Sequence, residues 1–528
     1  MWTARFAAAA LIAAGVATAA EAKSLTFCAS GNPEGFDPAL YTLPATFDAS
    51  SIAIYDRLFA FEKGTTKPAP ALATSWEISE DGLEYTFHLR IGVKFQTTAW
   101  FTPTRDYNAD DVVFSLARQL KKDHPYFNYR GGTWPYFQAM SLPALIKSIE
   151  KIDDTTVKMT LVRAEASFIA DLGMDFASIV SKEYADKLIA DKNQGKLDLQ
   201  PVGTGPFVFV ESAADGVVRY KANPDYWRGK PALDELVFAV TPDPVVRLQK
   251  IKSGACQVAD PAPRDIAAIK ATPDLVLMQG PNLDVGYLAY NTQQKPFDDA
   301  KVRQALNMAI DKRALVDAVF AGAGVVAKNP LPPTVWSYDD GAADDAYDPE
   351  GAKKLLDEAG VKDLKLKLWA MPVSRSYNPD GKKSAEMIKA DFAKIGVEAT
   401  IVTADWGDFL RRSSAKDRDG AVLLGWTGDN GDPDNFLAQL LSCDSVGYSN
   451  RAEWCNQGFQ DLIVKAKTTT DPAARADLYK QAQAIFKSEA PWATLAHSLA
   501  TVALSKKVTG YTIDPFGAHR FDAVDVTP

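Results

Sequence analysis

The sequence contains few of the residues on which metal binding most often depends. Only four of its 528 residues are histidine and only four are cysteine. The histidines are His88, His124, His497 and His519. No two of them have the spacing of a metal-binding pair, so we interpret each as a structural or surface residue. The cysteines also lack the short Cys-x-x-Cys spacing that is typical of zinc sites. We therefore expect neither a bound metal nor a cofactor.

Sequence motifs of catalysis are missing as well. No Gly-x-Ser-x-Gly turn is present to expose a nucleophilic serine. The glycine-rich run 203–207 lacks the Lys-Ser/Thr pair of a phosphate-binding loop, and Pro206 removes a backbone donor, so it predicts a tight turn before a strand at 207–210. Three aspartates lie close together in the sequence, Asp429, Asp432 and Asp434. Acidic residues are too common for this alone to indicate a glycosidase pair. We expect no catalytic residues, and a secreted hydrolase is the enzyme alternative.

Long apolar runs are absent after the first 22 residues, where no stretch reaches the roughly 18 residues of a membrane-spanning helix. The first 22 residues themselves indicate a secretory signal peptide, because Arg5 precedes a small and apolar run at 6–20 and Ala20-Glu21-Ala22 ends it. We expect cleavage after Ala22. The mature chain would then have 528 − 22 = 506 residues, enough for two or three domains, and would reside in the periplasm.

Positive charge is in deficit, with 58 Lys and Arg residues against 67 Asp and Glu residues and a formal net charge of −9. This balance argues against nucleic acid or an anionic membrane surface as the main partner. Hydrophobic residues make up 47% and charged residues 24%, a composition that is typical of a globular protein.

An even number of cysteines after a signal peptide suggests disulfides formed in an oxidising compartment. Three pairings of Cys28, Cys256, Cys443 and Cys455 are possible. The close pair, Cys443 and Cys455, is the first choice because 455 − 443 = 12 positions close a small loop. Cys28 and Cys256 would then join the mature N-terminus to a distant segment.

Alternation and capping signals indicate interleaved strands and helices, and so an α/β fold. Apolar residues alternate with polar ones at 85–89 and at 157–161, which predicts two half-buried strands. Asn108 can cap a helix with Asp111 in its first turn, and Asp348-Pro349 opens another helix that Gly360 closes. A longer helical segment carries four apolar residues on one face: Val302, Leu306, Ala309 and Ile310. The run Gly280-Pro281-Asn282 is the best candidate for a crossing between domains.

Several short motifs, in order along the chain, resemble the extracellular solute-binding proteins (family 5) that serve peptide ABC importers, most closely the dipeptide-binding branch. The motifs are Pro33–Phe36, Phe47–Ser51, Ala71–Ala73, Trp76–Gly82, Asn108–Phe114, Val302–Leu306 and the segment Gly425–Asn435. The cysteine placement is similar to the two bridges of that branch. The resemblance extends over essentially the whole mature chain.

The resemblance implies a two-lobed α/β fold of the periplasmic-binding-protein type II, with hinge strands and a ligand cleft between the lobes that closes on the ligand. The boundaries we predict are 1–22 for the signal peptide, 23–55 with 190–280 and 500–528 for lobe I, 56–189 for an accessory subdomain of lobe I, and 281–499 for lobe II. We expect a monomer that binds a short peptide and a membrane permease.

Two charged residues match the positions with which the family holds a peptide's ends. The resemblance assigns Asp429 to the ligand's α-ammonium group and Arg375 to its α-carboxylate. A zwitterionic peptide that enters a closed cleft needs such fixed charges because an unpaired buried terminus is costly, and a planar guanidinium can donate two parallel hydrogen bonds to a carboxylate. A dipeptide would fit between the two clamps. Candidate residues for lining the side-chain pockets are Trp426, Trp406, Met371 and Tyr377.

Other ligands and partners stay open at this point. A binding protein of this family can carry haem or another small nutrient instead of peptides, and no axial haem ligands can be assigned from the sequence. A chemoreceptor is a further conceivable partner, since more than one membrane protein can recognise a closed pair of lobes.

Overall fold

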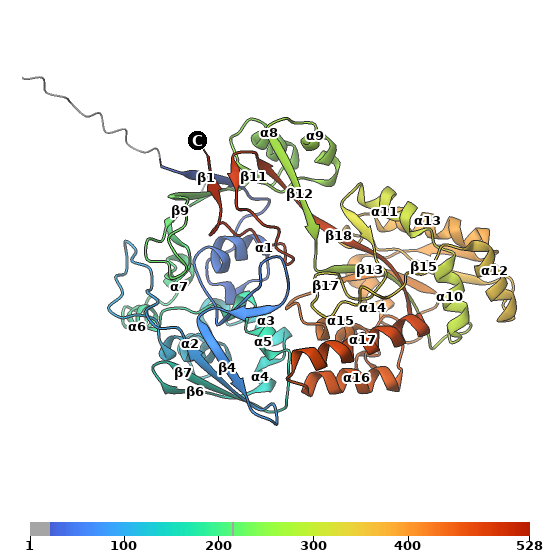
Figure 1. Cartoon of the computed structure of the whole chain (residues 1–528), viewed down its shortest axis with the longest axis horizontal. Helices are drawn as coiled ribbons and strands as arrows, with labels where there is room; N and C mark the ends of the chain where they lie inside the picture. The colour runs from blue at the N-terminus through green and yellow to red at the C-terminus, as the bar shows by residue number, and fades with distance from the viewer. Residues whose placement is uncertain (1–21, 214–215, 528) are drawn as a thin grey trace, which may run out of the picture.

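The computed structural model describes residues 22–213 and 216–527 (Figure 1). The predicted signal peptide, apart from Ala22, lies outside the described residues. Helices and strands interleave along the chain, as the sequence predicts.

The strands of the first half are β1 (Ser24–Cys28), β2 (Phe59–Phe61), β3 (Pro68–Pro70), β4 (Ala73–Ile78), β5 (Glu84–Leu89), β6 (Ile146–Asp153), β7 (Thr156–Leu161), β8 (Phe207–Ser212), β9 (Val217–Ala222), β10 (Glu235–Ala239) and β11 (Val258–Ala259). Those of the second half are β12 (Leu275–Pro281), β13 (Asp284–Tyr290), β14 (Gly324–Val326), β15 (Lys365–Trp369), β16 (Glu398–Val402), β17 (Ala421–Thr427), β18 (Trp492–Ser505), β19 (Val508–Thr509) and β20 (Asp525–Val526).

The helices of the first half are α1 (Pro44–Phe47), α2 (Ala109–Leu120), α3 (Pro135–Ala139), α4 (Leu142–Leu145), α5 (Phe168–Asp171), α6 (Lys182–Ala190), α7 (Lys196–Leu199), α8 (Pro244–Lys252) and α9 (Ile266–Lys270). Those of the second half are α10 (Ala300–Met308), α11 (Lys312–Phe320), α12 (Pro349–Glu358), α13 (Gly381–Lys394), α14 (Trp406–Ser413), α15 (Asp434–Leu441), α16 (Gln457–Thr468) and α17 (Pro472–Glu489).

One long strand, β18, links the sheet strands of the two halves of the chain. Its first part pairs with β13 and β14, and its second part pairs with β12 and β11. The order along the resulting sheet is β16-β15-β17-β13-β18-β11-β1-β10-β9-β8. A separate antiparallel sheet has the order β4-β5-β7-β6. It contains both strands that alternation predicts, at 85–89 and 157–161.

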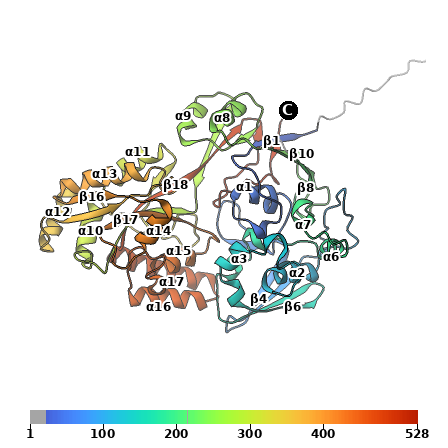
Figure 2. The same cartoon turned by 180° about the vertical axis from the view of Figure 1, so that it is seen from behind.

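The hydrophobic cores fall into two groups on either side of β12 and β18, which join them in both views (Figures 1 and 2). In the N-terminal group, the buried residues of the cores lie between 25 and 275 and between 502 and 524. In the second group, they lie between 283 and 496. The run Gly280-Pro281-Asn282 lies where β12 ends beside β18, with Gly280 opposite Ala500.

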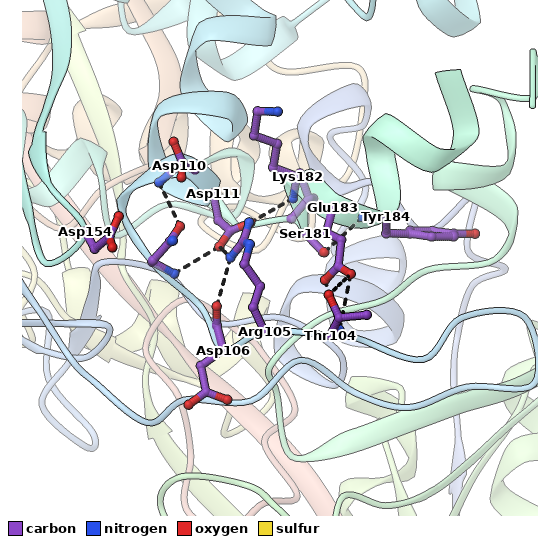
Figure 3. Close-up of polar contacts among 12 residues, drawn as sticks. Thr104, Arg105, Asp106, Asp110, Asp111, Asp154, Ser181, Lys182, Glu183 and Tyr184 are labelled. Atoms are coloured by element: carbon purple, nitrogen blue, oxygen red, sulfur yellow. Dashed lines mark hydrogen bonds and ion pairs between the residues drawn. The ribbon is translucent and has the colours of Figure 1, made fainter. Parts of the chain in front are cut away.

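The start of α2 shows how local sequence signals become tertiary contacts. Asn108 caps α2 and Asp111 lies in its first turn, as predicted, and together the two side chains form a capping box. The Asp111 carboxylate is fully buried and also accepts hydrogen bonds from the Arg105 guanidinium, at 2.7 and 2.8 Å, and from the backbone N–H of Lys182, at 2.8 Å. Figure 3 shows these contacts converging on Asp111. The capping carboxylate therefore ties the N-terminus of α6 to that of α2.

Two other local predictions are confirmed, and a third, for one long helical segment, is wrong about where the helix ends. Asp348 caps α12, and Gly360 adopts φ +71° after the helix ends. The chain bends at 204–206 just before β8, which begins at Phe207 as predicted. A Cβ on Gly203 would lie 2.0 Å from the Ile54 carbonyl oxygen, so close packing of two backbones requires glycine there. The apolar face predicted as one helical segment ends early, because α10 stops at Met308 and Ile310 belongs to the buried connection to α11.

Both disulfides pair as predicted, Cys28 with Cys256 and Cys443 with Cys455. Among residues 22–213 and 216–527, none of the helices combines the length and the apolar character that crossing a bilayer requires.

Candidate functional site

Three neighbouring parallel strands bring the predicted ligand residues to one edge of the sheet. Strand β15 pairs in parallel with β16 on one side and with β17 on the other. Parallel strands end at the same edge, where ligands bind in open α/β sheets. Arg375 follows β15, Trp406 follows β16 and Asp429 follows β17. The fold thus gathers three residues that are far apart in the sequence.

Strand β17 leads directly into the segment that carries Asp429. The backbone N–H of Gly428 donates to the Leu283 carbonyl at 2.8 Å, which extends the pairing with β13 past the end of the strand. Gly431 then turns the chain with φ +72°, and a Cβ at that position would lie 2.5 Å from Thr66. Glycine is needed here both for the positive φ and for the close approach.

Asp429 is half-buried and has no cation partner among the described residues. Its carboxylate Oδ2 accepts a hydrogen bond from Asn435 Nδ2 at 3.1 Å, and its backbone N–H donates to Asn435 Oδ1 at 3.0 Å. Burial raises the pKa of the Asp429 carboxyl, and the bond from Asn435 opposes that rise. A half-buried carboxylate that lacks a counter-charge can bind an incoming cation.

Arg375 is exposed and likewise has no carboxylate partner among the described residues. Its backbone exchanges hydrogen bonds with Asn378, which forms a narrow turn after β15. The guanidinium lies 5.2 Å from the ring centre of Trp406, a cation–π contact that orients it. Burial raises the pKa of Tyr377 to about 12, with the neighbouring Arg375 charge opposing the rise.

The four predicted lining residues differ in their exposure. Trp406 and Trp426 are half-buried at the edge of the sheet, and Trp426 Nε1 donates to Asn435 Oδ1 at 3.0 Å. Met371 and Tyr377 are only 3% and 9% exposed and belong to the hydrophobic core of the second group. Their burial favours core packing, so their contact with a ligand stays a prediction.

The Asp429 segment also faces the N-terminal group. The charge of Asp429, after burial, helps to raise the pKa of Tyr136 on α3 to about 12. Asn430 Nδ2 donates to Asp171 Oδ1 at 2.7 Å, across 259 positions of sequence. The candidate site therefore lies where the two groups meet. Sequence reasoning missed Tyr136, for which no local signal exists, and Asn435, which lies inside the motif that contains Asp429.

The neighbouring aspartates have structural partners, which weakens a hydrolase interpretation. Asp432 forms a bidentate ion pair with Arg475, at 2.9 and 3.0 Å, and Asp434 pairs with Lys467 at 3.3 Å. Burial raises the pKa of Asp434 to about 7. Within the described ranges no cluster of His, Cys, Asp and Glu has the arrangement of a metal site.

Comparison with known proteins shows the family of this chain. Residues 67–448 match the family of bacterial extracellular solute-binding proteins, family 5. The chain is 51% identical to the dipeptide-binding protein of Escherichia coli (98% of this chain, 97% of the relative) and 50% identical to heme-binding protein A of Haemophilus influenzae (96% and 94%). A crystal structure of a Pseudoalteromonas dipeptide-binding protein in complex with Met-Leu matches with a TM-score of 0.73 and 41% identity (96% and 100%). This chain belongs to family 5 of the bacterial extracellular solute-binding proteins, a family of binding proteins rather than enzymes.

Proposed function

We propose that the protein captures short peptides, dipeptides first, in a cleft between two lobes and delivers them in the periplasm to the permease of an ABC importer. The observation that carries the proposal is the pair of opposite charges, Asp429 and Arg375, that leave the same edge of the sheet and lack ionic partners among the described residues. A free dipeptide supplies both missing charges. The relatives named for dipeptide binding support this ligand class.

We expect the two charged residues to compensate for the water that the peptide's charged ends lose when they enter the cleft. The peptide's ammonium group exchanges water for the Asp429 carboxylate, and its carboxylate exchanges water for the Arg375 guanidinium, which Trp406 holds in place. Each hydrogen bond to a charged group contributes about 1.5–3 kcal/mol. A longer peptide would lose one clamp or hold the cleft open, so we expect dipeptides to bind more tightly than longer peptides.

The lobes correspond to the two groups of hydrophobic cores. Lobe I comprises 23–55, 190–280 and 500–528 with 56–189 as its accessory subdomain, and lobe II comprises 281–499. One continuous core runs through lobe I and the accessory subdomain, which supports their moving as one body. Strands β12 and β18 cross between the lobes and serve as the hinge. The protein acts as a monomer.

Calorimetric titration tests the clamps on protein freed of ligand by unfolding and refolding. The ligands are Ala-Ala, its N-acetylated form, its C-amidated form and tetra-alanine. We expect Asp429→Asn to weaken Ala-Ala binding at least tenfold and to erase the preference for the free amine, and Arg375→Met to erase the preference for the free carboxylate. Asp298→Asn and Arg313→Met, which replace exposed residues of the second group, are the controls. Equal binding of all four ligands by the wild type would refute the dipeptide assignment.

Haem is the second candidate ligand because a relative at 50% identity is named a heme-binding protein. Absorbance titration with haemin, followed by addition of excess Ala-Ala, distinguishes haem binding from peptide binding. Displacement of haemin by the dipeptide would indicate a shared cleft, whereas no spectral change with haemin removes this candidate. Mass spectrometry of the bound peptide after incubation tests the hydrolase alternative.

A further inference from the structure

A single amide side chain connects three parts of the candidate site. Asn435 Oδ1 accepts hydrogen bonds from the indole N–H of Trp426 and from the backbone N–H of Asp429, both at 3.0 Å. Its Nδ2 group donates to Asp429 Oδ2 at 3.1 Å. The amide therefore links the Trp426 side chain at the end of β17, the backbone of the following segment and the Asp429 carboxylate.

We propose that Asn435 is a positioning residue, which orients the Asp429 carboxylate so that its Oδ1 atom faces the ligand's ammonium group and holds the Trp426 ring beside it. The proposal rests on the proposed function. Among the described residues no hydrogen bond involves Asp429 Oδ1, whereas Oδ2 is engaged by Asn435. One oxygen is thus held by the protein and the other is available to a ligand.

The backbone around Asp429 has three anchors besides its own bond to Asn435. The N–H of Gly428 bonds to β13 at 2.8 Å, the side chain of Asn430 bonds to Asp171 at 2.7 Å, and Asp432 pairs with the buried Arg475. The anchor at Gly428 precedes Asp429, and the anchors at Asn430 and Asp432 follow it. Loss of the Asn435 amide should consequently leave the segment folded, while it frees the Asp429 carboxylate, the Trp426 indole and the backbone N–H of Asp429.

The bond from Asn435 also bears on the charge of Asp429. Burial in this position favours the neutral carboxyl and so raises its pKa, and a donated hydrogen bond favours the carboxylate. Only the ionised form attracts an ammonium group. If Asn435 has this role, its removal makes dipeptide binding fail at a higher pH, an effect that a purely structural residue does not produce.

Two substitutions separate the orienting bond from the other contacts. Asn435→Ala removes all three hydrogen bonds. Asn435→Asp has nearly the same shape and keeps an acceptor for the two N–H groups, but it replaces the donor to Asp429 by a second carboxyl group. Two adjacent carboxyl groups resist ionising together, which raises the pH at which both are charged. Asn456→Ala is the matched control, since Asn456 is also half-buried and accepts a backbone bond, from Phe459 at 3.0 Å, at the start of α16.

The experiment is calorimetric titration of Ala-Ala between pH 4.5 and 8.5 with the wild type, the three variants above, Asp429→Asn and the double variant Asp429→Asn/Asn435→Ala. We expect Asn435→Ala to bind at least tenfold more weakly at pH 7. The low-pH loss of affinity should move to higher pH in both Asn435 variants, and Asn456→Ala should match the wild type. In an Asp429→Asn background, Asn435→Ala should cause little further loss of affinity for Ala-Ala.

Three outcomes overturn the proposal. If Asp429→Asn weakens binding but Asn435→Ala does not, Asn435 has no positioning role while the proposed function stands. If Asn435→Ala and Asp429→Asn weaken binding additively with an unchanged pH profile, the role of Asn435 is structural. If Asp429→Asn binds as the wild type does, both the clamp and its positioning residue are wrong. Thermal unfolding of each variant checks folding, and the isosteric Asn435→Asp variant serves if the alanine variant unfolds.

Discussion

His519 lies in a buried network that ties the last segment of the chain to two distant parts of the N-terminal group. Its Nε2 atom is 3.0 Å from Asp260 Oδ1, its Nδ1 atom is 2.7 Å from the Tyr511 hydroxyl, and its backbone N–H donates to Asp48 at 2.8 Å. Burial alone would lower the pKa of the imidazole, but the charges of Asp260 and Asp48 more than offset it and raise the pKa to about 9. The ring is thus a buried imidazolium at neutral pH.

Replacing this ring by an uncharged side chain should make stability depend on pH in a defined way. A rise from an ordinary pKa of 6.5 to about 9 is about 2.5 units, which corresponds to about 3 kcal/mol of unfolding free energy. Because the folded-state pKa is raised, the contribution is fully present below pH 6.5 and is lost as the pH rises to about 9. We expect the stability difference between the wild type and His519→Gln to be larger at pH 6 than at pH 10 by about this amount. Any difference that remains at pH 10 reflects the lost packing and hydrogen bonds of the ring.

Urea denaturation of both proteins from pH 6 to 10 measures the difference. Groups whose pKa does not depend on His519 cancel in it, whereas Asp48 does not, because burial raises its pKa to about 7 and the charge of His519 opposes that rise. Since the chain has only four histidines, NMR of the imidazole protons can follow His519 directly. His124 is an internal contrast, because burial lowers its pKa to about 4. In an Asp260→Asn background, the pH-dependent part of the stability difference between the two proteins should be smaller, because Asp260 helps to raise the pKa of His519. A difference that is flat across this range, or a His519 resonance that titrates near pH 6.5, would refute the reasoning.

Other substitutions test the packing that supports the site. Gly425→Ala places a Cβ 2.2 Å from Tyr377 Cδ2, so we expect a loss of about 1–3 kcal/mol in urea unfolding; wild-type stability would contradict this contact. Arg475→Met strands the buried Asp432 and should cost about 3–5 kcal/mol, and adding Asp432→Leu should restore much of it; a double variant no better than the single one argues against the pair. Replacing Cys443 and its partner by serine opens a 12-position loop and should lower the free energy of unfolding by about 3 kcal/mol, while equal denaturation midpoints would contradict that value.

Much of the local structure could be predicted from the sequence because its causes lie within a few residues. Asn108 and Asp111 encode a helix start through side chains that reach backbone N–H groups one turn away. Alternating apolar residues encode β5 and β7 since the side-chain period of a strand is two. The motifs also indicate the family, and the short separation of Cys443 and Cys455 indicates their pairing. The roles of Asp429 and Arg375 follow from that family resemblance and stay a prediction.

The tertiary structure alone decided how these pieces meet. No local rule states that β15, β16 and β17 are parallel neighbours, yet this order brings Arg375, Trp406 and Asp429 to one edge. Nor could the sequence tell that Tyr377 is packed in the core, over Gly425, instead of being open to solvent. Contacts such as Asn430 with Asp171 join residues 259 positions apart. Strand order and register depend on the burial of whole faces summed over the domain, and no window of sequence contains that sum.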